Sequence, residues 1–193
     1  TFRSHIDQKN WAITQARYPH ILSLDADECL SEKLKKSILE AKENWKYDGY
    51  YFNRLTNYCG KWIRHTTWYP SRKLRLWDST KGHWGGLNPH DRYMLGPGAT
   101  RKFLKGDLLH YSYYSIDEHY AQLEKFSTIH ARSYHQMGIK NGPVKGMVHA
   151  GWRFLNDYIF RLGILDGKKG FIISKLGAKE VWLKYKKLGE LNR

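Results

Sequence analysis

Apolar side chains recur at two different spacings along the chain. Over the first 115 residues, runs with helical spacing alternate with short apolar runs that are typical of strands. In this part of the chain, the spacing predicts helices over residues 6–16 and 31–44. It predicts strands over residues 21–24, 50–55, 73–77 and 108–111. We expect the strand over residues 21–24 to be buried. Between Trp77 and Pro97 the chain is rich in Gly, His, Trp and Pro, a composition too irregular for a regular element and typical of a loop that carries a site.

After Ser115 the spacing of the apolar residues is helical. Three helices are predicted: over residues 116–137, from Pro143 to about residue 162, and from residue 167 to about residue 188. The stretch from Ser115 to Glu118 has the form of a capping box, and Pro143 suits the first turn of a helix. The change of character divides the chain into an α/β part, residues 1–115, and a helical part, residues 116–193.

The composition points to an anionic partner. Among 193 residues, Lys and Arg outnumber Asp and Glu by 33 to 18, which gives a formal net charge of +15. Such a surplus favours binding to nucleic acid, a phosphorylated substrate or an acidic membrane surface. No apolar run approaches the roughly 18–20 residues that a membrane-spanning helix needs. Cys29 and Cys59 lack the spacing of a metal site or a disulfide framework, which favours a reducing, cytoplasmic setting.

The apolar run over residues 21–24 ends in two carboxylates, Asp25 and Asp27, with one small residue between them. Side chains alternate along a strand, so both carboxylates start on the same side, where the chain leaves the sheet. Ligands of open α/β sheets commonly bind beyond such strand ends, and oxygen ligands there suit a divalent cation that carries a phosphate. An ordinary turn after a strand, with Ser31 capping the next helix, accounts for the same residues.

Several ordered motifs resemble glycosyltransferase family 2, and more narrowly its lipopolysaccharide-core glucosyltransferase branch. They are residues 8–10, 16 and 21–28, which resemble the stretch leading into the family's DXD motif; residues 65–70 (HTTWYP) and 73–77 (KLRLW), which are similar to the WYP and KLRLF motifs of the branch; and residues 106–111 and 165–167. The resemblance covers nearly the whole chain.

The resemblance implies an α/β protein of the GT-A (nucleotide-diphospho-sugar transferase) fold, without its N-terminal strand–helix portion and with a C-terminal helical extension. It implies an inverting glycosyltransferase that moves a sugar from a UDP-glucose-like donor to a lipopolysaccharide-core or similar glycan acceptor. It also implies a divalent metal, Mn²⁺ or Mg²⁺. By position, Asp25 would face the ribose or sugar of the donor, and Asp27 would ligate the metal that bridges the diphosphate. Lys9 and Asn10 would lie near the donor, and Arg75 would reach the diphosphate.

The resemblance also assigns a catalytic base. It places an acid after a His in the loop that follows residues 73–77, and here His90 and Asp91 occupy that place. A carboxylate within hydrogen-bond reach of the acceptor hydroxyl is the usual base for such a reaction. The branch more often has Glu there, so Asp91 needs a closer backbone; an ordinary loop Asp that orders a turn is the alternative. His90 and Trp68 are expected among the substrate-binding residues, while Thr66 and Thr67 replace a glycine pair of the branch.

His110 stands where some GT-A enzymes supply a third metal ligand. Imidazole suits Mn²⁺ better than Mg²⁺. A packed, hydrogen-bonded histidine beside aromatic residues is the alternative for His110.

The helical part carries a second clue. One face of the predicted helix after Pro143 is apolar, made by Val144, Met147, Val148, Gly151, Leu155, Tyr158, Ile159 and Leu162. A core helix with a solvated basic side explains this pattern. Basic residues mixed with aromatic ones, with seven lysines between residues 168 and 187, also fit an anionic membrane surface. An enzyme that extends a lipid-linked glycan needs such a landing surface, so we expect a peripheral protein on the cytoplasmic face of the cell membrane.

Two other functions fit part of the sequence. A nucleic-acid-binding module would use the positive charge and the aromatic residues, but it leaves the two carboxylates after the strand unexplained, and we expect no nucleic-acid partner. A phosphatase with an aspartyl nucleophile also has an apolar strand before a DXD motif, yet Glu28 and Cys29 follow here and no later acidic pair is evident. Because the chain begins at Thr1 within a predicted helix, we expect a missing front portion and weak or no turnover by these 193 residues alone.

Overall fold

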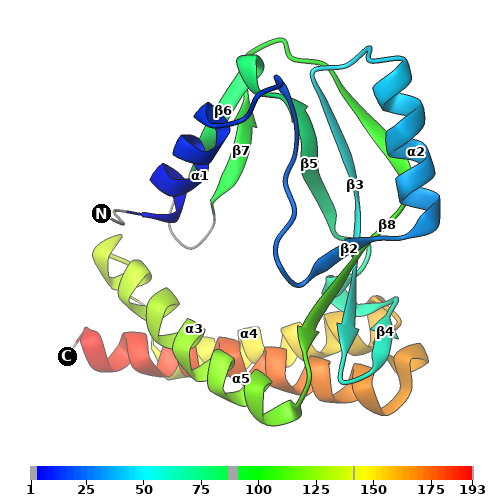
Figure 1. Cartoon of the computed structure of the whole chain (residues 1–193). Coiled ribbons are helices and arrows are strands. Elements are labelled where there is room, and N and C mark those ends of the chain that lie inside the picture. Colours follow the sequence, from blue (N-terminus) through cyan, green and yellow to red (C-terminus); the bar gives the residue numbers. More distant parts are fainter. Residues whose placement is uncertain (1–3, 87–90, 141, 193) are drawn as a thin grey trace. The chain divides into compact units, whose positions relative to one another are not determined.

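The computed structural model describes residues 4–86, 91–140 and 142–192 (Figure 1). It is a mixed α/β protein in which a sheet is followed along the chain by C-terminal helices. Contacts divide the chain into two compact units: unit 1 comprises Thr1–Arg54 and Ser71–His110, and unit 2 comprises Leu55–Pro70 and Tyr111–Arg193. Two long strands, β3 (Gly49–Tyr58) and β8 (Arg101–Tyr113), contribute residues to both units. The separation of residues 1–115 from 116–193 remains a prediction.

Unit 1 contains most of the strands. Besides parts of β3 and β8, its elements are α1 (His5–Thr14), β1 (His20–Leu22), β2 (Glu28–Leu30), α2 (Glu32–Glu43), β5 (Arg72–Asp78), β6 (Gly82–Gly85) and β7 (Arg92–Leu95). The larger sheet has the strand order β1-β5-β3-β8-β2. Most neighbours are antiparallel, but β3 and β8 run in the same direction, because Gly49 N donates to Thr100 O at their beginnings and Cys59 N donates to Tyr113 O at their ends.

The first predicted strand exists but is not buried. β1 is three residues long, and none of its side chains is buried. In the described sheet it pairs with β5 alone, so one of its edges has no strand beside it. A strand at the edge of a sheet is covered by a neighbouring strand on one side only and so stays more exposed than a central strand. This explains why the apolar residues of β1 are not fully buried. The two carboxylates still follow it, as predicted.

The expectation of an irregular loop between Trp77 and Pro97 is wrong, because β6 and β7 form an antiparallel hairpin there. Trp84 lies opposite Tyr93 in the hairpin, and the Tyr93 ring stacks on Trp77 of β5 with 4.1 Å between ring centroids. These three rings form their own buried cluster. Aromatic pairs across strands stabilise hairpins, and here they outweigh the glycine-rich composition.

Helix α2 lies against one face of the sheet and is fixed to β8 at its first turn (Figure 1). Ser31 caps the helix by accepting a hydrogen bond from Leu34 N, and the same hydroxyl accepts one from Asp107 N. Gly106 has φ +108, and a Cβ at this position would collide with the Leu34 backbone. Glycine is therefore required where β8 crosses the start of α2.

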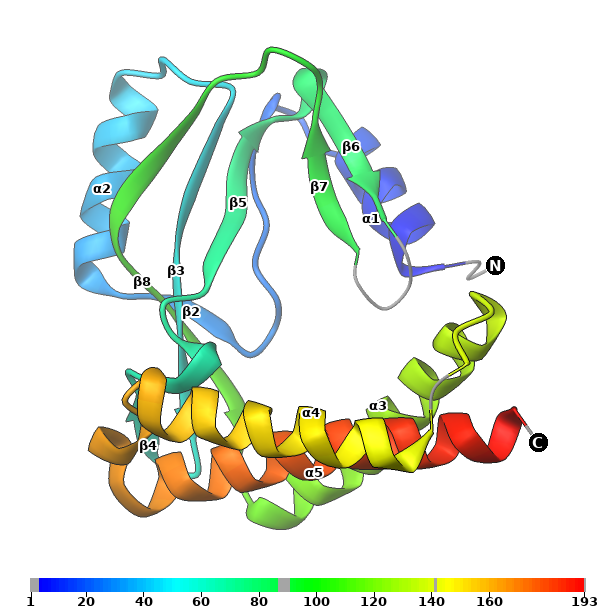
Figure 2. The ribbon, with the colours of Figure 1, turned by 180° about the vertical axis from the view of Figure 1, so that it is seen from behind.

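Unit 2 is built around three helices. Its further elements are β4 (Lys61–Ile63), the 3-10 turn Thr66–Trp68, α3 (Ile116–Gln136), α4 (Pro143–Leu155), the π-helix Asn156–Phe160, the 3-10 turn Gly163–Asp166 and α5 (Gly167–Leu191). Helix α5 packs against both α3 and α4, and Figure 2 shows α4 lying along α5. The predicted capping box between Ser115 and Glu118 is confirmed. Within the described residues, no helix combines the length and apolar character needed to cross a membrane.

A buried histidine of unit 2 gives a pH-dependent stability. His119 Nδ1 lies 3.0 Å from the Tyr58 hydroxyl, inside a cluster with Trp68 and Tyr113. Burial lowers the pKa of His119 from 6.5 to about 4. The unfolded chain therefore binds a proton that the folded chain does not, so stability is complete above the ordinary pKa and falls as the pH drops from 6.5 toward 4.

We expect this histidine to cost about 2 kcal/mol of folding free energy over that interval, after allowance for partial hydration. Urea unfolding of the wild type and of His119→Phe, at pH values between about 7.5 and 4.5, measures it. The unfolding free energy of the wild type, minus that of His119→Phe, should decrease as the pH falls. A difference that is constant with pH would contradict the assignment.

Candidate functional site

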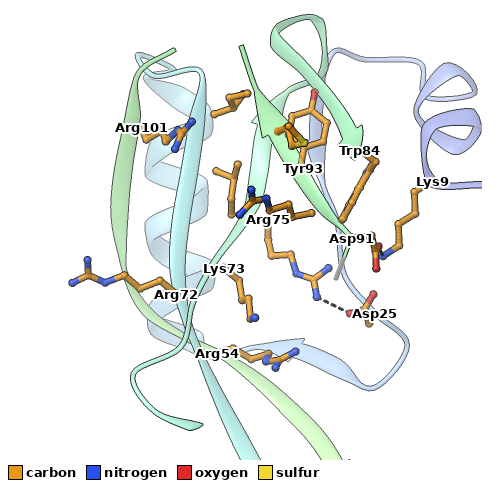
Figure 3. A pocket seen from close by; sticks show the side chains of 14 residues that line it. Lys9, Asp25, Arg54, Arg72, Lys73, Arg75, Trp84, Asp91, Tyr93 and Arg101 are labelled. Atoms are coloured by element: carbon orange, nitrogen blue, oxygen red, sulfur yellow. Dashed lines mark hydrogen bonds and ion pairs between the residues drawn. The ribbon is translucent and has the colours of Figure 1, made fainter. Parts of the chain in front are cut away.

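A cavity of about 740 Å³ lies in unit 1 and is lined mainly by charged side chains (Figure 3). The cations come from α1, β3, β5, β7 and β8, and the carboxylates follow β1 and precede β7. The charged lining residues are Lys9, Arg54, Arg72, Lys73, Arg75, Arg92 and Arg101, with Asp25 and Asp91. Seven cations and two carboxylates thus line the cavity, a surplus that favours a ligand with several negative charges.

Arg75 organises one side of the cavity. Its Nη2 donates to Asp25 Oδ2 at 2.6 Å and to Glu28 Oε1 at 3.0 Å, and Figure 3 shows the first of these bonds. Glu28 is fully buried at its side chain, and its other oxygen accepts a hydrogen bond from Asp25 N. Burial by itself would raise the pKa of Asp25. The hydrogen bond and charge of Arg75, with the charges of Lys9 and Arg54, outweigh burial and hold that pKa below its usual value, so Asp25 is ionised at neutral pH.

Arg54 and Lys73 are two further cations of the cavity, and each is close enough to other cations to be affected by their charge. Burial, together with the charge of Arg75, lowers the pKa of both Arg54 and Lys73. Arg54 Nη1 lies 3.8 Å from Glu28, while Arg54 Nε is buried and has no hydrogen-bond partner among the described residues. An anion in the cavity would relieve the repulsion among Arg54, Lys73 and Arg75.

Helix α1 brings Lys9 to the opposite side. Its ammonium lies 2.6 Å from Asp91 Oδ2 and 4.3 Å from the centre of the Trp84 ring. Figure 3 shows Lys9 reaching from α1 toward Asp91, next to Trp84. Asn10 holds the helix in place, because its side chain donates to Trp84 O and accepts from Trp84 N. Asn10 therefore positions α1 on β6, and Lys9 is the residue of this pair that lines the cavity.

Asp27 and His110 lie together. His110 Nε2 is 3.2 Å from Asp27 Oδ2, because β2 and β8 pair with Glu28 opposite His110. Burial, followed by the charge of Arg54, lowers the pKa of His110, which keeps the imidazole neutral at pH 7. Neutral imidazole is the form that binds a metal.

The chemistry of these two donors fits a metal that also binds phosphate. No group of three or more His, Cys, Asp or Glu side chains that could hold a metal ion occurs in the part of the chain that the structure describes. A closed structural site is therefore not formed by these residues. One or two protein ligands, completed by substrate phosphate and water, are common for Mg²⁺ and similar ions.

The structure brings together four residues that the sequence analysis proposed, Lys9, Asp25, Arg75 and Asp91, in the lining of one cavity. Trp68 belongs to unit 2, where it stacks on Tyr113 in an aromatic cluster, and it does not line this cavity. His90 lies outside the described residues.

The sequence analysis missed several cations of the cavity. Lys73 could have been predicted, because it lies two residues before Arg75 in β5. Side chains two residues apart in a strand point to the same face of the sheet. Arg72, Arg92 and Arg101 had no such signal, because exposed basic residues in strands are usually solvated.

Comparison of the chain with models of known protein families and with solved structures gave no match.

Proposed function

We propose that this protein is a metal-assisted inverting glycosyltransferase with the GT-A fold. Its donor is a nucleotide-sugar of the UDP-glucose type, and its acceptor is a lipopolysaccharide-core or similar surface glycan. The observation that carries this proposal is the meeting of Lys9, Asp25, Arg75 and Asp91 in one cation-rich cavity. These residues are up to 82 positions apart in sequence, and the resemblance assigned each of them to the donor or to catalysis.

Further support comes from the chemistry of the cavity. A nucleoside diphosphate carries charges that the surplus of arginine and lysine would stabilise. Asp27 and His110 lie outside the lining of this cavity and contact each other; they would hold Mn²⁺ or Mg²⁺, which would neutralise charge on the leaving diphosphate. Thr66 has φ +65, a conformation that favours glycine, at the place where the branch has a glycine pair.

In the proposed reaction, Asp25 and Arg75 position the donor, and cations of the cavity stabilise charge that develops on the diphosphate. Asp91 accepts the proton of the acceptor hydroxyl as that oxygen attacks the anomeric carbon. Lys9 contacts one carboxylate oxygen of Asp91 and so orients the other toward an acceptor. Because nucleotide-sugars are cytoplasmic metabolites, we place the reaction at the cytoplasmic face of the cell membrane.

The test is an assay of sugar transfer. The chain is incubated with Mn²⁺, a panel of UDP-sugars and truncated lipopolysaccharide-core acceptors, and products are identified by mass spectrometry. The proposal predicts a product whose mass has grown by one hexose or amino sugar. Hydrolysis of an aryl phosphate without transfer would favour the phosphatase, and a salt-sensitive gel shift with oligonucleotides would favour the nucleic-acid-binding module.

A further inference from the structure

Helix α4 exposes its apolar side. Val144 and Val148 are each 70% exposed, Trp152 is 59% exposed and Leu155 is 47% exposed. These residues, with Met147 and Gly151, follow each other at three- and four-residue spacing and therefore form one stripe along the helix. A core position for this face, the simplest interpretation of its sequence, is wrong.

The apolar surface continues beyond α4 into the π-helix and the turn that follows. Ile159, Phe160, Leu162, Ile164 and Leu165 are all between 49% and 66% exposed. The ring of Phe160 lies 5.6 Å from that of Trp152, which joins this segment to α4. We call the exposed apolar residues between Val144 and Leu165 the α4 face. Contiguous apolar surface of this kind usually marks an interaction site.

The orientation of α4 is fixed by its other side. Gly146 is buried, and a Cβ there would press on Tyr185 of α5. Arg153 Nε donates to the buried Asp157 carboxylate at 2.8 Å, and Arg153 Nη2 donates to Thr67. The small residue and the ion pair are thus used for packing within unit 2, which leaves the apolar stripe on the surface.

The charges around the α4 face have one sign. In the described part of residues 140–175, the exposed charged residues are all cations: Lys140, Lys145, Arg161, Lys168 and Lys175. The two acids of this range, Asp157 and Asp166, are buried; Asp157 pairs with Arg153, and Asp166 accepts hydrogen bonds from Arg64 N and His65 N. The exposed charges that residues 140–175 contribute around the α4 face are therefore all positive, while the exposed Glu190 of α5 lies near the start of α4.

We propose that the α4 face docks on an anionic lipid bilayer, with its apolar side chains inserted at the level of the headgroups and the rim of cations bound to lipid phosphates. Trp and Phe beside aliphatic residues, flanked by Lys and Arg, are the composition of interfacial helices. A second copy of this chain fits less well, because two faces with the same positive rim would repel each other. The membrane surface expected from the sequence included both α4 and the lysine-rich helix α5, but on α5 Tyr185 is buried and Lys187 is bound to Glu124.

The test is flotation of the full chain with vesicles of phosphatidylcholine, with and without phosphatidylglycerol, in the absence of nucleotide. Leu155→Glu is the main variant, and Leu39→Glu on α2 is its matched control, since Leu39 is 51% exposed and also lies within a helix. Partitioning onto phosphatidylglycerol vesicles should fall by about tenfold or more in Leu155→Glu, which is the effect of losing one buried leucine. Leu39→Glu should bind as the wild type does. Reversal of two rim charges, in Lys145→Glu with Arg161→Glu, should weaken binding to phosphatidylglycerol vesicles several-fold per charge.

Three results would overturn the proposal. They are no binding of the wild type to either kind of vesicle, equal binding by Leu155→Glu and Leu39→Glu, and a wild-type dimer that Leu155→Glu dissociates without any vesicle binding. The last result would assign the α4 face to a second copy of the chain. Because these measurements use no nucleotide, they neither require the proposed sugar transfer nor fail with it. Circular dichroism confirms that each variant is folded, as expected for exposed positions.

Discussion

Asp91→Asn is expected to lower the rate of sugar transfer by about 10²–10⁴-fold while UDP binding changes little. Asparagine keeps the size of the side chain but cannot accept the proton of the attacking hydroxyl. It also loses the ion pair with Lys9, which is part-exposed and therefore contributes little to stability. The measurement is kcat for transfer, together with the UDP dissociation constant from calorimetry.

Asp78→Asn is a suitable control for this variant, because Asp78 also lies in unit 1 and accepts local hydrogen bonds from Thr80. Its turnover should stay within a few-fold of the wild type. If Asp91→Asn transferred sugar at the wild-type rate, Asp91 would not be the base, and it would be a loop carboxylate that orders the chain before β7.

Arg75→Met is expected to destabilise the protein by about 3 kcal/mol or more. The side chain of Arg75 is 9% exposed and that of Glu28 is completely buried, so the substitution leaves a buried carboxylate. Arg54, whose Nη1 lies 3.8 Å from Glu28 Oε1, then remains as an ion-pair partner of Glu28 and is too distant to replace the lost bond. Urea unfolding at neutral pH measures the loss.

Two comparisons separate this effect from the loss of any cavity arginine. Arg101→Met makes the same change at an exposed position of the same cavity lining and should cost less than about 0.5 kcal/mol. Arg75→Met combined with Glu28→Gln should recover part of the stability, because the buried charge is removed as well. Similar losses for Arg75→Met and Arg101→Met would show that the pair with Glu28 contributes little.

Local signals in the sequence predicted the helices well, whereas only residues 108–111 of the 13-residue strand β8 were predicted. The Ser31 cap, the capping box at Ser115 and Pro143 in a first turn each mark the start of a helix that the structure contains. A cap acts through side-chain and backbone groups of a few neighbouring residues, so it can be recognised without knowledge of the fold. The strands β2 and β4 were missed because each is only three residues long and is defined by its partner in the sheet.

The errors concern features that depend on packing between distant segments. The β6–β7 hairpin is held by Trp77, which lies on another strand, and the exposure of the α4 face follows from the contact of Gly146 with Tyr185. Neither contact can be read from the local pattern. The meeting of Lys9 with Asp91 is also a long-range event, and only the resemblance suggested that these two residues work together.

The cations of the cavity show the same limit in another form. Arg54 and Arg101 are unremarkable in sequence, since basic residues on strands are usually solvated. Their importance comes from the register that places Arg54 near Glu28 and from the cavity that both residues line. The net charge of +15 predicts an anionic partner but does not predict where such a partner would bind.

The most direct test of the proposed donor site is calorimetric titration of the chain with UDP, in Mn²⁺ and again in a chelator. Asp27→Ala is compared with Asp117→Ala, whose exposed carboxylate lies in the first turn of α3, in unit 2. We expect Mn²⁺ to tighten UDP binding by at least about tenfold. Asp27→Ala should abolish this gain, and Asp117→Ala should retain it. UDP binding that is absent, or equal with and without Mn²⁺, would contradict a metal–diphosphate site at Asp27 and His110.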